Sequence, residues 1–208
     1  GAVAAGDQIH SRAWVGSTPK NWADRLGLSD ELAGSLVGAA VRETFEECGV
    51  LLASTRTGRR ALPDDRVRDR ERAALISRSR TLAELFTEYD LILRADTLHA
   101  WARWVTPRTA PRRYDTAFFV TRIPDGEYAD ARTTEAVEAA WWHPAEALER
   151  HRLGELKLMP PTLHNLRELA EHEHTESVLT AATHRVIEPI EPTMRRKDRK
   201  STRLNSSH

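Results

Sequence analysis

The sequence predicts an α/β (α+β) domain in which strands and helices are mixed along the chain. Apolar residues recur with a helical period before residue 49, which predicts a long amphipathic helix. Aromatic and β-branched residues then gather in short runs that predict strands. Prolines stand in front of further amphipathic segments, where they suit the first position of a helix. Elements mixed in this order are typical of layered α/β and α+β domains.

The first half of the chain is organised around the long helix. Residues 1–30 hold the breakers Gly16 and Pro19 and no sustained period, so we expect mostly loop there. The helix begins with Ser29 or Asp30 as N-cap and ends at Cys48, because Gly49 suits a left-handed C-cap. The elements expected next are a strand at 50–52, a basic loop at 54–65, and helices near 66–79 and 81–89, the last opened by a capping box at Thr81.

The second half is predicted to be strands followed by helices. The expected elements are strands at 102–106, 114–123 and 135–142, a turn at 124–126, and helices at 144–151 and after Pro160-Pro161. Residues 187–193 contain two prolines and are expected to be a linker into the tail. Four tryptophans are expected in the core rather than on a stacking platform: Trp101, Trp104, Trp141 and Trp142.

Composition narrows the class of protein. The chain has 208 residues, 40% of them hydrophobic and 30% charged, which is typical of a globular domain. It contains neither an apolar run long enough for a membrane helix nor the features of a signal peptide. Its single cysteine favours a reducing, cytoplasmic compartment. Residues 195–208 carry a net charge of +5, so the remainder carries −5, which argues against nonspecific nucleic-acid binding.

Three glutamates share one face of the long helix. At about 100° per residue, Glu43, Glu46 and Glu47 fall within an arc of about 100°, and Val37, Val41, Thr44, Phe45 and Cys48 lie nearly opposite. Arg42 precedes Glu46 by one turn and is placed to pair with it. Three like charges repel one another unless a cation lies among them, and Mg²⁺ and Mn²⁺ prefer carboxylate oxygens. On the glutamates alone, a solvated acidic face is the commoner interpretation.

The surrounding residues resemble a known motif. Residues 42–50 resemble the second half of the Nudix box, R-E-U-x-E-E-x-G-U with U aliphatic, and depart from it at Thr44. Gly1 and Asp7 match the spacing of the first half, with Asp in place of Glu. Between Asp7 and Arg42 lie 34 residues rather than the usual seven. An insertion at this point is a feature of one branch, the acyl-coenzyme-A diphosphatases related to the nineteenth human Nudix paralogue.

Later segments are similar to the same branch. They are residues 101–107, 113–119, 135–142 and 158–162. The resemblance therefore runs from Gly1 to about His172. It implies a Nudix fold, with a mixed sheet sandwiched between helices and a helical insertion. It also implies a diphosphatase that hydrolyses a nucleotide-linked diphosphate.

The resemblance also implies roles for particular side chains. Glu46 and Glu47 are expected to ligate Mg²⁺ or Mn²⁺, with Glu43 as a further ligand or the general base and Arg42 as their support. Family members add a carboxylate shortly before a tryptophan, and Glu135 is preferred to Glu138 for this part. Asp7 can support the loop that leads to the helix. Arg113 and Tyr114 are weaker candidates for substrate contact.

The substrate and the extent of the domain follow from the same resemblance. The first choice is coenzyme A or its acyl thioesters, with ADP-ribose, a dinucleotide or a nucleotide sugar as alternatives. For coenzyme A, we expect Arg112, Arg113 and Arg122 to form a basic patch for the 3′-phosphate and the helices at 66–89 to wall an apolar channel. A non-catalytic Nudix-fold binding module is a further alternative, and the oligomeric state is left open. Residues 1–186 are expected to form a domain that lacks its N-terminal strands. Residues 187–208 are expected to be a linker and a tail, and 200–208 resemble a translated sequencing adapter.

Overall fold

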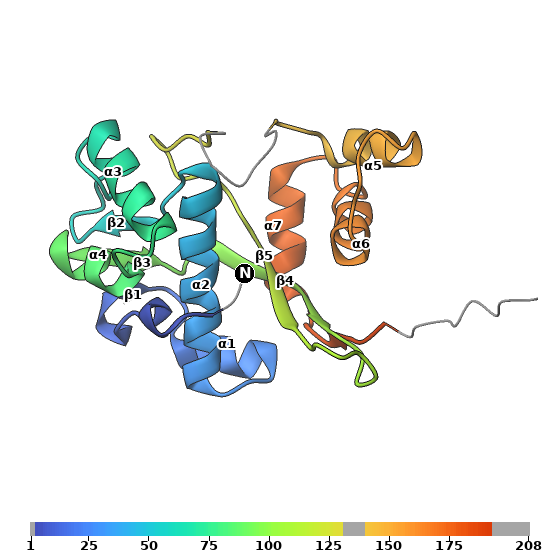
Figure 1. Ribbon diagram of the computed structural model, residues 1–208, viewed down its shortest axis with the longest axis horizontal. Helices are drawn as coiled ribbons and strands as arrows, with labels where there is room; N and C mark the ends of the chain where they lie inside the picture. Colours follow the sequence, from blue (N-terminus) through green and yellow to red (C-terminus); the bar gives the residue numbers. More distant parts are fainter. Residues whose placement is uncertain (1–2, 131–139, 193–208) are drawn as a thin grey trace, which may run out of the picture.

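The computed structural model describes residues 3–130 and 140–192. The helix α2 stands between two three-stranded sheets (Figure 1). The helices are α1 Pro19–Leu26, α2 Asp30–Cys48, α3 Asp65–Ile76, α4 Leu82–Glu88, α5 Pro144–Arg152, α6 Pro160–Leu169 and α7 Thr175–His184, with 3₁₀ turns η1 Ala5–Asp7 and η2 Ser11–Ala13. The strands are β1 Trp14–Val15, β2 Ala53–Thr55, β3 Leu91–Arg94, β4 Leu98–Val105, β5 Asp115–Thr121 and β6 Pro189–Ile190.

The first sheet has the order β1-β3-β2 and is mixed, since β3 is parallel to β1 and antiparallel to β2. The predicted strand at 50–52 is wrong. These residues are buried, but the chain turns where the Ala53 N–H donates to the Leu51 carbonyl, and the strand and its register with β3 begin at Ala53. The insertion between β2 and β3 forms α3 and α4, close to the predicted helices.

The second sheet has the order β5-β4-β6 and is also mixed. Strands β4 and β5 form an antiparallel hairpin with an irregularity between Ala100 and Ala102. The strand expected at 102–106 is β4, which begins earlier, at Leu98, and ends at Val105. The linker predicted at 187–193 is also corrected, because Pro189 and Ile190 pair in parallel with Arg103 and Trp104.

Two helices were not foreseen. Residues 1–30 are not mostly loop, because Thr18 and Asn21 form a capping box, Pro19 takes the first turn, and α1 packs Trp22 and Leu26 into the core beside α2. Pro19 starts this helix rather than breaking one, as its fixed φ allows. The helix α7 packs on β4 and β5, and buries Ala182 beside Trp101.

The predicted strand at 135–142 falls mostly on residues 131–139, which lie outside the described residues. Residues 140–143 form no strand. Trp101 is buried as expected, and Trp104 packs against the same small cluster. Trp141 is not in the core, because 78% of it is exposed, and Trp142 lies under the guanidinium of Arg150. In the described residues, no helix has the length and apolarity needed to cross a membrane.

Candidate active site on helix α2

Local signals set the two ends of α2 as predicted. The Ser29 hydroxyl accepts a hydrogen bond from the Leu32 N–H, and acidic residues follow in the first turn, where the helix dipole favours them. Gly49 has a φ of 75°, a left-handed conformation that glycine adopts without strain. Its N–H donates to the Phe45 carbonyl at 3.0 Å. The helix thus ends directly after the residues that carry the carboxylates.

The two faces of α2 are those that the helical period predicts. Val37, Val41 and Phe45 are fully buried in the main core. Glu43 and Glu46 are half-buried and Glu47 is exposed on the other face. The apolar face therefore anchors the helix while the opposite face presents the carboxylates.

Thr44 departs from the aliphatic pattern of the Nudix box. Its hydroxyl donates to the Ala40 carbonyl one turn earlier at 2.8 Å, and the side chain is half-buried. The hydroxyl is thus satisfied by the helix itself, as threonine often is in helices. This position can therefore hold a polar residue, because the hydroxyl needs no hydrogen-bond partner from the core.

Within the described part of the chain, Arg42 contacts three carboxylates. Its Nε donates to Asp7 Oδ1 at 2.7 Å, its Nη1 to Glu46 Oε2 at 2.7 Å, and its Nη2 lies 2.9 Å from Glu43 Oε1. The predicted pairing of Arg42 with Glu46 is confirmed. Burial alone would lower the Arg42 pKa, but the bonds and charges of Asp7 and Glu46 outweigh it and raise that pKa. The guanidinium is therefore permanently charged.

Asp7 reaches this cluster from the turn η1. Only 1% of its side chain is exposed, and its Oδ2 accepts a hydrogen bond from the Ala4 N–H at 2.7 Å. The turn lies directly on α2 because residue 38 is glycine. A Cβ there would stand 1.9 Å from the Asp7 carbonyl oxygen. The structure thus joins Asp7 to Arg42 across the 34 intervening residues.

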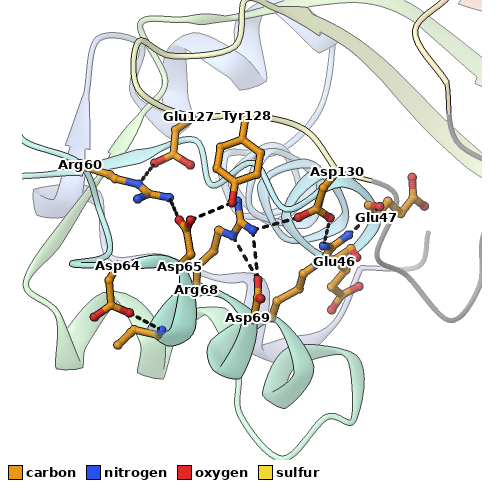
Figure 2. A network of polar contacts seen from close by, with 12 residues as sticks. Glu46, Glu47, Arg60, Asp64, Asp65, Arg68, Asp69, Glu127, Tyr128 and Asp130 are labelled. Atoms are coloured by element: carbon orange, nitrogen blue, oxygen red, sulfur yellow. Dashed lines mark hydrogen bonds and ion pairs between the residues drawn. The ribbon is translucent and has the colours of Figure 1, made fainter.

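A second buried cluster meets the carboxyl end of α2. Arg72 of α3 donates through Nε to the Glu46 carbonyl at 2.9 Å and through Nη2 to the Glu47 carbonyl at 2.8 Å. Its Nη1 pairs with Asp130, which also pairs with Arg68 at 2.9 Å. Figure 2 shows Asp130 between Arg68 and the end of α2 that carries Glu46 and Glu47.

The cluster of Arg68, Arg72 and Asp130 was not predicted from the sequence. The buried positions of α3 hold charged residues where apolar ones are expected, namely Arg68, Glu71 and Arg72, followed by Leu75. Residues at this spacing lie on one face of a helix, and this periodicity was the sequence signal that could have indicated a buried charged face. A highly charged segment is usually solvated, so the pattern alone pointed to the surface.

The predicted substrate contacts lie elsewhere. Arg113 and Tyr114 are exposed at the start of β5, where Arg113 donates to the Thr106 carbonyl at 3.3 Å and Arg112 lies over the Tyr114 ring. Figure 1 shows this hairpin tip well away from the carboxyl end of α2. Arg122 pairs with Glu176 at the other end of β5. A seven-residue strand spans roughly 20 Å, so Arg113 and Arg122 cannot form one phosphate site.

The carboxylates of α2 fit a divalent metal by donor type. Glu43, Glu46 and Glu47 offer the hard oxygen ligands that Mg²⁺ and Mn²⁺ prefer. Within residues 3–130 and 140–192, no three acidic, histidine or cysteine side chains lie close enough together to hold a metal ion. Glu135 and Glu138, the predicted additional carboxylates, lie outside those residues. The described part of the site is therefore an open carboxylate face.

Comparison with known proteins agrees with this geometry. The family model described as the NUDT19 Nudix domain matches residues 10–169. The chain belongs to the NUDT19 Nudix family. The solved structure of a Nudix hydrolase from Alicyclobacillus acidocaldarius superposes with a TM-score of 0.66 at 25% identity, covering 86% of this chain and 78% of that one. The predicted α/β Nudix fold is confirmed.

Three curated relatives, from Homo sapiens, Xenopus laevis and Gallus gallus, are named acyl-coenzyme A diphosphatase NUDT19. The human protein is 35% identical over 172 residues, which are 73% of this chain and 43% of the human one. The Gallus gallus protein is 28% identical over 190 residues, which are 81% of this chain and 50% of that protein. The chain thus spans half or less of the length of these relatives.

Proposed function

We propose that this Nudix domain is a metal-dependent hydrolase of a nucleotide-linked diphosphate. The observation that carries the proposal is the carboxylate face of α2, where Arg42 holds Glu43 and Glu46 while Glu47 stands exposed beside them. Carboxylates crowded on one helix face repel one another, which costs stability unless a cation joins them. A binding module without catalysis has no need of this arrangement.

The side chains have distinct parts in the proposed reaction. Glu46 and Glu47 would hold Mg²⁺ or Mn²⁺, which when bound neutralises phosphate oxygens and makes water more acidic. Glu43 would hold the cation as well or accept the proton of the attacking water. Arg42 keeps Glu43 and Glu46 in place through its anchor on Asp7. Glu135 stays a predicted additional carboxylate.

Coenzyme A or an acyl-coenzyme A is the proposed substrate. Water would attack a phosphorus of the diphosphate, the bridging P–O bond would break, and the products would be 4′-phosphopantetheine, free or acylated, and adenosine 3′,5′-bisphosphate. Support comes from the names of the human and Gallus gallus relatives and from the matching family model. This substrate assignment rests on family resemblance. Relatives that share a fold can differ in substrate specificity.

Another nucleoside diphosphate derivative is the second candidate. The carboxylate face acts on the diphosphate and does not distinguish what lies on either side of it. The basic patch that we expected for the 3′-phosphate of coenzyme A is not assembled, since Arg112 and Arg113 lie at one end of β5 and Arg122 at the other. ADP-ribose, dinucleotides and nucleotide sugars therefore belong in the same test.

A substrate panel separates these possibilities. The full chain is incubated with Mg²⁺ or Mn²⁺ and with coenzyme A, its acyl esters, ADP-ribose, a dinucleotide or a nucleotide sugar, and the products are identified by mass. We expect coenzyme A compounds to turn over fastest and to yield adenosine 3′,5′-bisphosphate. If ADP-ribose is cleaved as fast, the substrate assignment fails while the diphosphatase assignment stands. No metal-dependent cleavage of any member contradicts both.

A further inference from the structure

We propose that Arg72 is a positioning residue for the carboxylates of α2. It acts through the backbone, because it binds the carbonyls of Glu46 and Glu47 rather than their side chains. This inference rests on the proposed function, since it gives Arg72 the task of orienting the groups that would hold the cation. It also gives the helix α3, which belongs to the insertion between β2 and β3, a part in the active site.

The contacts of Arg72 complete the end of α2. The last four carbonyls of a helix have no partner within it. Here the Phe45 carbonyl accepts from the Gly49 N–H, and the Cys48 carbonyl accepts from the Asp130 N–H at 2.9 Å. Arg72 supplies the two donors between them. Every carbonyl of the final turn therefore has a partner, and the turn is held against fraying.

Burial makes this cap specific. Only 3% of the Arg72 side chain is exposed, so its donors are not replaced easily by water. Its planar fork reaches two carbonyls and the Asp130 carboxylate at once, which a lysine ammonium cannot do with the same geometry. The positive charge of Arg72 at the carboxyl end of α2 also interacts favourably with the helix dipole. Gly49 leaves room for the fork, because a Cβ there would lie 3.1 Å from Arg72 Nη1.

Arg68 offers a matched control in the same cluster. It lies one turn before Arg72 on α3, is equally buried, and pairs with the same carboxylate of Asp130 (Figure 2). Its other partners are Asp69 and the ring of Tyr128, and it donates to no carbonyl of α2. Loss of Arg68 disturbs the cluster without removing the cap.

The experiment compares Arg72→Lys with Arg68→Lys in the full chain. Mn²⁺ affinity is measured by electron paramagnetic resonance, with the melting temperature and the kcat and KM for a cleaved diphosphate. We expect both variants to melt lower, but only Arg72→Lys to weaken Mn²⁺ binding and lower kcat, each by about tenfold, with KM changed less. This size is typical of residues that orient metal ligands.

Two further variants keep the test decisive. Arg72→Gln retains an amide donor for one of the two carbonyls but loses the charged fork, so we expect it to weaken Mn²⁺ binding as well, and this variant serves if Arg72→Lys fails to fold. Glu46→Gln tests the proposed function itself and should weaken Mn²⁺ binding strongly. If Glu46→Gln has no effect, the metal assignment fails. If it weakens binding while Arg72→Lys behaves like Arg68→Lys, the positioning role is overturned.

Discussion

The charge cluster around Arg42 on α2 and the charge cluster around Glu71 on α3 have opposite ratios of acidic to basic groups. On α2, one guanidinium, Arg42, serves three carboxylates. On α3, one carboxylate, Glu71, accepts from Arg70 Nη2 at 2.6 Å, from the Tyr89 hydroxyl at 3.0 Å and from Arg80. Among the contacts of the described residues, the Arg42 cluster holds three carboxylates to one guanidinium, whereas the Glu71 cluster holds two guanidinium groups and a hydroxyl to one carboxylate. Excess carboxylate suits binding a further cation, and a saturated carboxylate suits stability alone.

The largest effect on turnover is expected at Glu46. Glu46→Gln removes the charge of a proposed metal ligand, so turnover of the diphosphate should fall by about a thousandfold, since a bound metal contributes several kcal/mol to such reactions. The melting temperature should change little. Glu31→Gln is the control, because Glu31 is an exposed acid in the first turn of the same helix. Equal turnover in the two variants would contradict the role of Glu46.

A smaller loss is expected when Arg42 is removed. Arg42→Ala should lower kcat by about 10- to 100-fold, as is typical when a support of metal ligands is lost. It should also cost about 3–5 kcal/mol of unfolding free energy, because the buried Asp7 loses its partner.

The double variant Asp7→Asn with Arg42→Ala tests whether the unpaired charge of Asp7 causes the loss of stability in Arg42→Ala. It should regain part of the stability, since no uncompensated carboxylate stays buried, but none of the turnover. A double variant as unstable as Arg42→Ala alone would show that the Asp7 charge is not the cause.

Gly38→Ala is expected to have a third, milder effect on turnover. The added methyl meets the backbone of Asp7, so η1 must shift and weaken the bond from Arg42. We expect kcat to fall by about tenfold and stability by about 1–3 kcal/mol. Gly34→Ala on the same helix is the control, because its Cβ would meet only Pro19 at 3.5 Å. It should match or exceed the wild type in melting experiments.

The cluster around Glu71, unlike that of Arg72, should affect stability and leave turnover unchanged. Burial alone would raise the Glu71 pKa, but the bonds from Arg70, Tyr89 and Arg80 outweigh it and lower that pKa from 4.5. A lowered pKa stabilises the fold above about pH 4.5, and the gain is lost as pH falls through the folded pKa. Glu71→Gln should thus cost about 1–3 kcal/mol at pH 7 and progressively less in acid. A constant difference between pH 7 and 3 would refute this assignment.

The sequence predicted the parts of the site that depend on local signals. Ser29 and Gly49 mark the ends of α2 by capping chemistry, and the helical period places Glu43, Glu46 and Glu47 on one face. The bond from Arg42 to Glu46 follows from a spacing of one turn. These features need no knowledge of the rest of the chain.

The features that were missed depend on contacts between distant segments. The two-residue strand β6 exists only because β4 lies beside it, and Arg72 caps α2 from a different helix. The pairing of β6 has no local signature, and the only local sign of the Arg72 contact is the set of charged residues on one face of α3. The helix α1 is different, because its capping box at Thr18 and Asn21 is local. It was missed because Pro19 was interpreted as a breaker rather than as a first helical residue.

The most direct test of the central claim is a metal-activation curve. Hydrolysis of a cleaved diphosphate is measured against Mg²⁺ and Mn²⁺ concentration for the wild-type chain, Glu46→Gln and Glu47→Gln, after circular dichroism has shown all three to be folded. We predict that the wild type is active only with the metal, and that each variant loses most turnover. Metal-dependent hydrolysis unchanged in both variants would contradict it.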